Sequence, residues 1–130
     1  MTKSGILGLR TTIYKVPDMV QAKEWYAKAF GTNPYWEGDA YTGFNIGGYE
    51  LGLHLEEHPT TDKPDTVLSY WGVENLHDHH GRLLALGATE HEPPTNVGGE
   101  IELSSVKDPW GNVIGLIYNP EFSIADTSEG

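Results

Sequence analysis

The chain has 130 residues and a mass of 14.3 kDa, which corresponds to one ordinary domain. Its 8 basic and 19 acidic side chains give a net charge of −11, which argues against binding to nucleic acid or to anionic membrane surfaces. The absence of cysteine excludes disulfides, iron–sulfur clusters, thiolate zinc sites and a cysteine nucleophile. No apolar run is long enough for a signal peptide or a transmembrane helix, so we expect a cytoplasmic protein.

The first half of the sequence predicts a strand, a helix and three further strands. Residues 8–16 are rich in β-branched and aromatic side chains, which favours a strand. A helix is expected over 19–30, because apolar residues recur there at intervals of three and four. Asp18 is the expected N-cap and Gly31 the expected end of this helix. Three strands are expected to follow, at 35–37, 41–46 and 49–56.

The second half repeats this order after a polar segment with two prolines. A strand is predicted at 66–73, and a helix at 76–86 with Asn75 as its N-cap. The stretch 90–97 is a weak strand candidate because prolines interrupt it, and two clearer strands are expected at 100–106 and 113–118. We therefore expect a single domain with four parts, which are module one at about 6–57, a linker at about 58–65, module two at about 66–120 and a tail at 121–130.

Short landmarks in the two halves also correspond. Val16-Pro17-Asp18-Met19 matches Val73-Glu74-Asn75-Leu76, and Leu51-Gly52-Leu53 matches Ile114-Gly115-Leu116. Each landmark occupies the same place in its element, and the spacing is about 60 residues. This pattern indicates two copies of one strand–helix–three-strand unit.

One longer motif carries a family resemblance. The segment 108–116, DPWGNVIGL, is similar to the DPxGN-x-x-E-L turn and last strand of the vicinal oxygen chelate superfamily, which includes glyoxalase I, bleomycin-resistance proteins and extradiol dioxygenases. The segment Val16-Pro17-Asp18 is similar to that family's opening. The resemblance implies an α+β fold in which tandem βαβββ modules form a U-shaped, eight-stranded mixed sheet with a concave ligand cleft. It also implies a homodimer.

The resemblance further implies four positions for metal ligands, on the first and last strands of the two modules. In this sequence they are occupied by Thr11, Gly52, Leu68 and Gly115. None of these side chains is suited to hold a catalytic divalent ion. We therefore expect no metal, no other cofactor and no catalytic residue of the usual kind.

Two histidine-containing groups leave alternatives open. His54 and Glu56 are two residues apart on one strand and could hold a metal in a rearranged site, which would make the protein a glyoxalase-like lyase or isomerase. No partner ligand is evident in the second half, so this is the less favoured hypothesis. His77, His79 and His80 begin the second helix, where surface or packing roles are expected. A third hypothesis is a regulatory module that dimerises and senses a metabolite.

The favoured hypothesis is a protein that binds a planar or cationic small organic molecule without the usual metal. Glycines at two of the four positions are expected to leave volume at the floor of the cleft. Aromatic side chains would stack on the ligand and polar ones would contact it. The predicted ligand-binding residues are Trp36, Tyr41, Phe44, Glu50, His54, Glu56, Tyr70 and Trp110.

Overall fold

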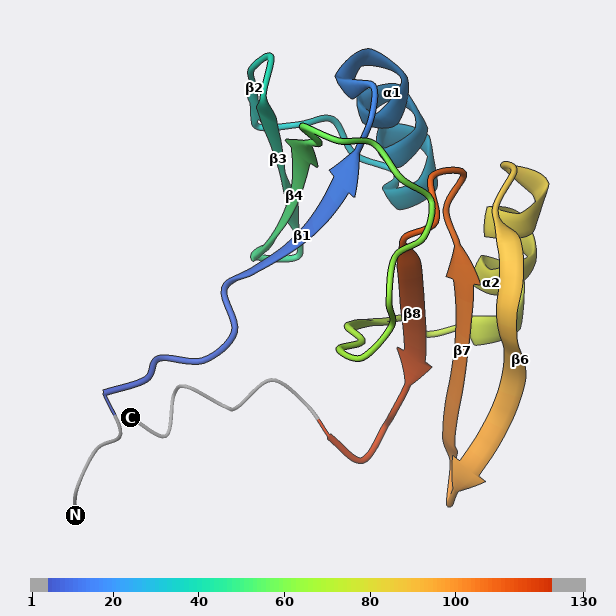
Figure 1. The fold of residues 1–130 in the computed structure, drawn as a ribbon. Helices are drawn as coiled ribbons and strands as arrows, with labels where there is room; N and C mark the ends of the chain where they lie inside the picture. Colours follow the sequence, from blue (N-terminus) through green and yellow to red (C-terminus); the bar gives the residue numbers. More distant parts are fainter. Residues whose placement is uncertain (1–4, 123–130) are drawn as a thin grey trace. The chain divides into compact units, whose positions relative to one another are not determined.

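The computed structural model describes residues 5–122. The expected tail at 121–130 lies outside this range from residue 123 onward. The chain divides into two compact units, Met1–Pro59 and Thr60–Gly130, and the boundary falls in the segment predicted as a linker. Each unit contains one βαβββ module, so the predicted α+β fold with tandem modules is confirmed (Figure 1).

Module one is a four-stranded mixed sheet with one helix. Its strands have the order β1-β4-β3-β2, in which β1 runs parallel to β4 and the other pairs are antiparallel. The elements are β1 (Thr11–Val16), α1 (Met19–Phe30), β2 (Trp36–Glu37), β3 (Tyr41–Ile46) and β4 (Tyr49–Leu55).

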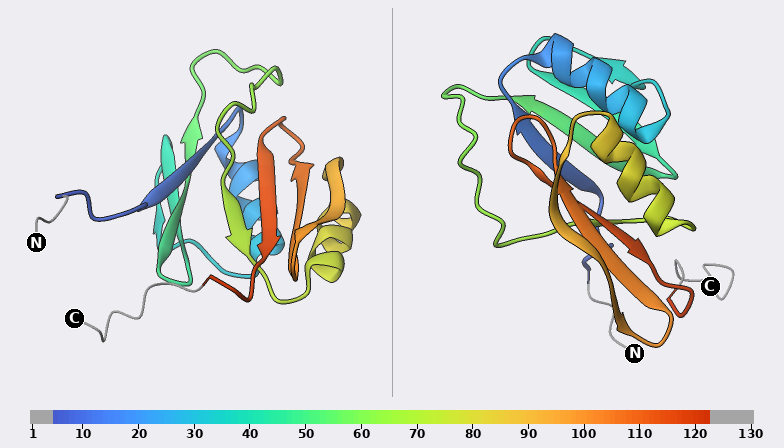
Figure 2. Two further views of the ribbon diagram at one scale, coloured as in Figure 1. Left: turned by 90° about the horizontal axis from the view of Figure 1, so that it is seen from below. Right: turned by 90° about the vertical axis from the view of Figure 1, so that its right-hand side faces the viewer.

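The core of module one lies between the sheet and α1 (Figure 2). Leu51 and Leu53 of β4 are completely buried, as alternation along a strand requires for one face. The ring of Tyr14 on β1 stacks on Tyr26 of α1, with centroids 5.5 Å apart. Helix α1 has the predicted bounds, because the Asp18 carboxylate accepts from the N–H of residue 21 at 3.0 Å and Gly31 adopts a left-handed φ of 68°.

Module two repeats the same topology, with the strand order β5-β8-β7-β6. The eight strands of the described residues are thus divided between two four-stranded sheets, whereas the resemblance implied one eight-stranded sheet. Neither helix in the described range is long and apolar enough to cross a bilayer. The elements are β5 (Tyr70–Gly72), α2 (Leu76–Ala85), β6 (Thr89–Gly98), β7 (Ile101–Lys107) and β8 (Val113–Tyr118).

Three strand predictions differ from the structure. Strand β1 begins at Thr11 and not at residue 8, and β5 is only three residues long. The weak candidate at 90–97 is instead part of β6, whose ten residues make it the longest strand described. Its prolines are tolerated because β6 is an edge strand and its pairing with β7 is interrupted by register shifts.

The DPWGN turn between β7 and β8 is organised by one buried carboxylate. Asp108 is 4% exposed and accepts from the backbone N–H groups of Trp110 and Asn112 at 2.9 and 2.8 Å. Its second oxygen accepts from the Asn112 side-chain amide at 2.9 Å. Gly111 follows with a φ of 94° and packs directly on the backbone of Thr61. The motif therefore has a structural role in this turn.

Candidate functional site

The face of the first sheet that is turned away from α1 carries most of the predicted site residues. In the strand register Gly43 lies opposite Gly52, and Asn45 lies opposite Glu50. On the neighbouring strand β2, Trp36 also lies opposite Gly43. Because paired residues share a face, all of these positions lie on the side opposite Leu51 and the core. We call this side the open face of module one.

Three aromatic rings of the open face lie directly over glycines. A Cβ atom at Gly52 would collide with the ring of Tyr41, and one at Gly43 would be 2.9 Å from the ring of Tyr35. At Gly38 it would be 2.5 Å from the indole of Trp36. The Trp36 and Tyr41 rings are 6.4 Å apart and tilted by 44°. The glycines thus make room for a continuous aromatic surface.

The Glu50 carboxylate lies at the edge of this aromatic surface and is held by hydroxyl groups. Thr11 donates to one carboxylate oxygen at 2.7 Å, and the Tyr35 hydroxyl donates to the other. These hydrogen bonds, that of Tyr35 first, hold the pKa of Glu50 below its usual value. Burial, followed by the nearby Glu50 charge, raises the pKa of Tyr41 to about 12. Glu50 is therefore an anion at neutral pH, and Tyr41 is a neutral phenol.

The lowered pKa of Glu50 predicts a pH-dependent contribution to stability. A carboxyl group whose pKa is depressed in the folded state stabilises the fold above its unfolded pKa, and this contribution disappears as the pH falls through the folded pKa. Replacing Glu50 by glutamine is expected to lower the free energy of unfolding by about 0.5–1 kcal/mol at pH 7, since the carboxylate is largely solvated. The loss is expected to shrink as the pH falls below about 4 and to vanish only below the lowered pKa of the folded state. Urea unfolding at both pH values measures it, with the exposed Glu24→Gln on α1 as the control.

Module two has a related arrangement on its own open face. Gly115 of β8 lies opposite Tyr70, and a Cβ atom there would be 2.7 Å from the Tyr70 ring. Burial and then the charge of Glu92 raise the pKa of Tyr70. Each module thus places a tyrosine ring over the glycine of its last strand, with a glutamate close enough to perturb the phenol.

A chain of polar contacts extends from Ser105 in module two. The Ser105 hydroxyl donates a hydrogen bond to a carboxylate oxygen of Glu92 at 3.0 Å. Nδ1 of His91 lies 2.9 Å from the Ser105 hydroxyl oxygen and therefore donates to it. Nε2 of His91 is 3.1 Å from a carboxylate oxygen of Asp65. The order Ser–His–Asp is that of a nucleophilic triad, but Ser105 is completely buried. These contacts therefore connect the segment before β5 to β6 and β7 and give the hydroxyl no access to a substrate.

The positions implied for a metal do not fit one. Thr11 is hydrogen-bonded to Glu50, and the space over Gly52 and over Gly115 is filled by tyrosine rings. Leu68 precedes β5 and is not in a strand. Within residues 5–122, no group of three or more His, Asp or Glu side chains is arranged to hold a metal ion. The expectation of free volume above the two glycines is therefore wrong, because the rings occupy it.

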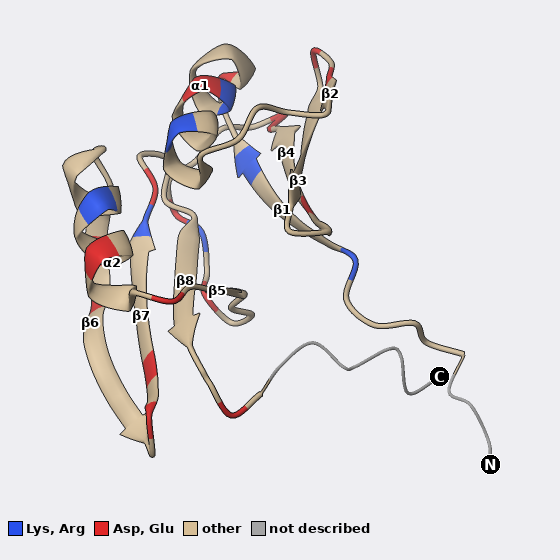
Figure 3. Cartoon of the chain, turned by 180° about the vertical axis from the view of Figure 1, so that it is seen from behind, with Lys and Arg blue, Asp and Glu red and all other residues tan. Residues whose placement is uncertain are grey.

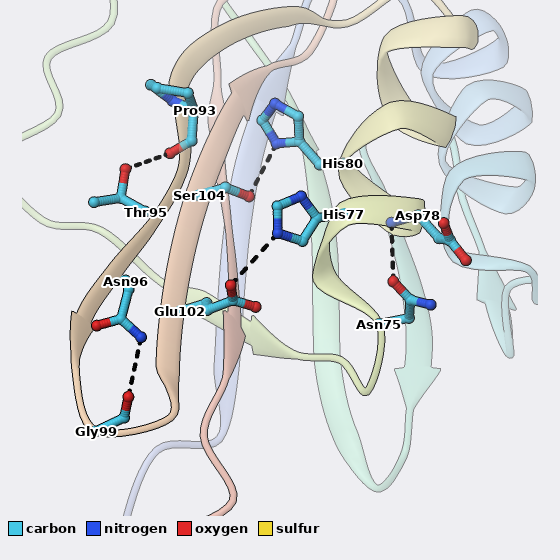
Figure 4. A network of polar contacts seen from close by, with 10 residues as sticks. All are labelled: Asn75, His77, Asp78, His80, Pro93, Thr95, Asn96, Gly99, Glu102 and Ser104. Atoms are coloured by element: carbon cyan, nitrogen blue, oxygen red, sulfur yellow. Dashed lines mark hydrogen bonds and ion pairs between the residues drawn. The ribbon is translucent and has the colours of Figure 1, made fainter.

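His77 and His80 of α2 lie on the other side of the second sheet (Figure 4). His80 is 4% exposed, with Nδ1 2.9 Å from the Ser104 hydroxyl and Nε2 2.8 Å from Glu90. His77 is 3.4 Å from Glu102. His77 and His80 thus each contact a partner on the sheet, His79 is exposed, and His80 has the packing role that the sequence predicts.

The structure distributes the eight predicted ligand-binding residues over several places. Trp36, Tyr41 and Glu50 lie together on the open face of module one. His54 is exposed on the same face, opposite Tyr41, and Glu56 follows the end of β4. Tyr70 lies on the open face of module two, and Trp110 lies in the Asp108 turn.

The interpretation of Phe44 is corrected by the structure. Phe44 is completely buried and pairs with Leu51, so it belongs to the core under α1. Tyr41 and Phe44 are three positions apart on one strand, and residues at odd spacing point to opposite faces. They therefore cannot both line the open face.

Sequence reasoning did not identify the partners of the site carboxylates. Tyr35, the donor to Glu50, lies just before β2 and is fixed by a hydrogen bond from its N–H to the Gly43 carbonyl at 2.9 Å. Alternation in 41–46 contains a signal for it, since a glycine facing an aromatic residue on a neighbouring strand indicates a ring lying over the backbone. His91 and Glu92 were hidden by the weak prediction for β6.

Comparison with known proteins identifies the family. The family model described as the Glyoxalase/Bleomycin resistance protein/Dioxygenase superfamily matches residues 8–116, which is most of the chain. The chain belongs to this superfamily. The comparison with curated proteins found no match to this chain.

Solved structures of the superfamily fold are similar over nearly the whole chain. A glyoxalase-related enzyme from Fulvimarina pelagi has a TM-score of 0.75 at 17% identity, covering 93% of this chain and 94% of that one. A fosfomycin resistance protein from Mesorhizobium loti has a TM-score of 0.69 at 15% identity, covering 89% and 95%. A superfamily enzyme from Burkholderia phytofirmans PsJN has a TM-score of 0.68 at 16% identity, covering 83% and 95%. At these identities the likeness shows the fold alone.

Proposed function

We propose that this superfamily member binds a small organic molecule on its open sheet faces, without the divalent metal implied by its family. The observation that carries the proposal is the replacement of the implied metal ligand by glycine on the last strand of each module. Glycine stands at the implied ligand position, and the tyrosine rings of Tyr41 and Tyr70 fill the space above it. Such faces offer aromatic surface and a carboxylate, which suit recognition of a molecule better than polarisation of its oxygens by an ion.

The proposed ligand is planar or cationic. Tyr35 and Trp36 are 62% and 53% exposed, although most large aromatic side chains gain stability from burial. Exposed aromatic surface next to a fixed carboxylate is typical of a binding site. By similarity to bleomycin-resistance proteins, the ligand would be sequestered and released unchanged.

A thermal-shift screen of planar and cationic compounds in the presence of a chelator tests the proposal. We expect hits that raise the melting temperature in proportion to the logarithm of their concentration. Tyr41→Ala is expected to weaken compounds that bind module one about tenfold or more, and Tyr70→Ala those that bind module two, because aromatic anchors dominate such sites. The matched control is Val20→Ala, an exposed apolar position on α1.

Two results would count against metal-free binding. One is a screen in which stabilising compounds appear only after a divalent metal is added. The other is equal weakening by Val20→Ala and Tyr41→Ala, which would mean that the compounds do not bind the open face.

The proposal includes a homodimer in the cytoplasm. The stretch before β1 exposes three large apolar side chains, since Ile6, Leu7 and Leu9 are 81%, 79% and 68% exposed. Apolar exposure of this kind favours a contact with a second copy. The alternative of a glyoxalase-like lyase that uses His54 and Glu56 has no specific observation in its favour, because the described residues place no third ligand with them.

A further inference from the structure

We infer that the open face of module one recognises the ammonium group of an organic cation. The group would lie against the Glu50 carboxylate and the three aromatic rings, those of Tyr35, Trp36 and Tyr41. This inference rests on the proposed small-molecule binding and names the ligand class and the residues that select it.

The first observation is a carboxylate whose charge is not compensated. Of the residues that the structure describes, none forms an ion pair with Glu50, whereas Glu37 on β2 is paired with Lys23 at 2.6 Å. The hydroxyl groups of Thr11 and Tyr35 orient the carboxylate but bring no positive charge. An ionised carboxylate has about four acceptor sites, so accepting positions remain.

Two basic residues lie within β1 or just before it, and no hydrogen bond or ion pair joins either of them to Glu50 in the described residues. Figure 3 shows basic segments within β1 and just before it. Arg10, before β1, directs its guanidinium to the carbonyls of Leu7 and Leu9 at 3.1 and 3.4 Å. Lys15 pairs with His54, four strand positions beyond Thr11, which corresponds to roughly 13 Å along the strand. Glu50 is therefore left to an external cation.

The second observation is the aromatic surface next to this charge. Gly43 lies under both groups, because a Cβ atom there would be 2.8 Å from the Glu50 carboxylate and 2.9 Å from the Tyr35 ring. The ring of Tyr41 lies over the neighbouring Gly52, and its centroid is 6.4 Å from that of the Trp36 ring. A quaternary ammonium group gains both from the ring faces and from an adjacent anion, and it needs no hydrogen-bond acceptor. Glu50 would repel an anion, and a neutral polar ligand gains at most a hydrogen bond from it.

The test uses two probes of the same shape. In choline a nitrogen carries the charge, and in neohexyl alcohol a carbon atom takes the place of that nitrogen. Titrations followed by NMR of the aromatic ring protons are expected to show choline binding at least about tenfold tighter than the alcohol. The difference is expected to shrink as salt is raised, since it comes from charge. Glu50→Gln is expected to reduce choline binding about tenfold and to leave the alcohol unchanged.

Glu24→Gln is the matched control, because it makes the same chemical change at an exposed position on α1. It is expected to leave both probes unchanged. Equal affinities for choline and the alcohol, or full choline binding by Glu50→Gln, would overturn the inference. Naphthol and naphthalene sulfonate added to the same sample separate this failure from that of the proposed function. If they bind while choline and the alcohol do not differ, only the cation selectivity is lost; if no probe binds, both proposals fail.

Discussion

Gly115→Ala is expected to lower the free energy of unfolding by about 2–3 kcal/mol, in the range of overpacked interiors. The added methyl group would lie 2.6 Å from the carbonyl oxygen of Ser69 and 2.7 Å from the Tyr70 ring. The ring can turn, but the carbonyl is held, because it accepts the Gly115 N–H at 3.1 Å directly before β5 begins. Urea denaturation of the wild type and the variant measures the loss.

Gly52→Ala is the matched comparison in module one. There the three atoms nearest to the new methyl group all belong to the side chain of Tyr41, which can swing away into solvent. We expect a loss below about 1 kcal/mol. The pKa of Tyr41, raised to about 12 in the native fold, is expected to fall toward its ordinary value as the ring loses burial. Equal losses at the two glycines, or an unchanged absorbance titration of the tyrosines, would contradict this view of the open faces.

Asp108→Ala is expected to be more destabilising than either glycine substitution, at about 3 kcal/mol. The substitution leaves three donors of the buried turn without their acceptor, two of them backbone N–H groups. Unpaired buried donors cost their full desolvation. The measurement is the urea midpoint at neutral pH.

Asp39→Ala, at an exposed position before β3, is the control for Asp108→Ala and is expected to change stability by less than about 0.5 kcal/mol. A small loss for Asp108→Ala would mean that the turn re-forms around other partners. The conclusion that this family motif has a structural role would then be wrong.

Much of the fold could be predicted because its signals are local. The cap at Asp18 and the glycine at the end of α1 each depend on residues adjacent in sequence. Strand β6 could not be predicted with confidence, because Pro93 and Pro94 are compatible with a strand only at an edge, and edge position is a property of the whole sheet.

The candidate site could be predicted only in part. Alternation along β4 correctly places Glu50 and His54 on the face opposite Leu51 and Leu53, because the period of a strand is two. The rings over the glycines could not be anticipated in the same way. Which side chain fills a space depends on cross-strand register, and a one-residue change of register moves every side chain to the other face.

Metal titration of chelator-treated protein tests most directly whether this protein binds its ligand without a divalent metal. Calorimetric titrations with Ni²⁺, Zn²⁺, Mn²⁺ and Fe²⁺ would be made on the wild type and on His54→Ala, together with elemental analysis of the untagged protein as purified. We expect no stoichiometric metal and unchanged binding of the screened compounds in chelator. Stoichiometric metal binding that His54→Ala abolishes would contradict metal-free binding and would favour a rearranged catalytic site at His54 and Glu56.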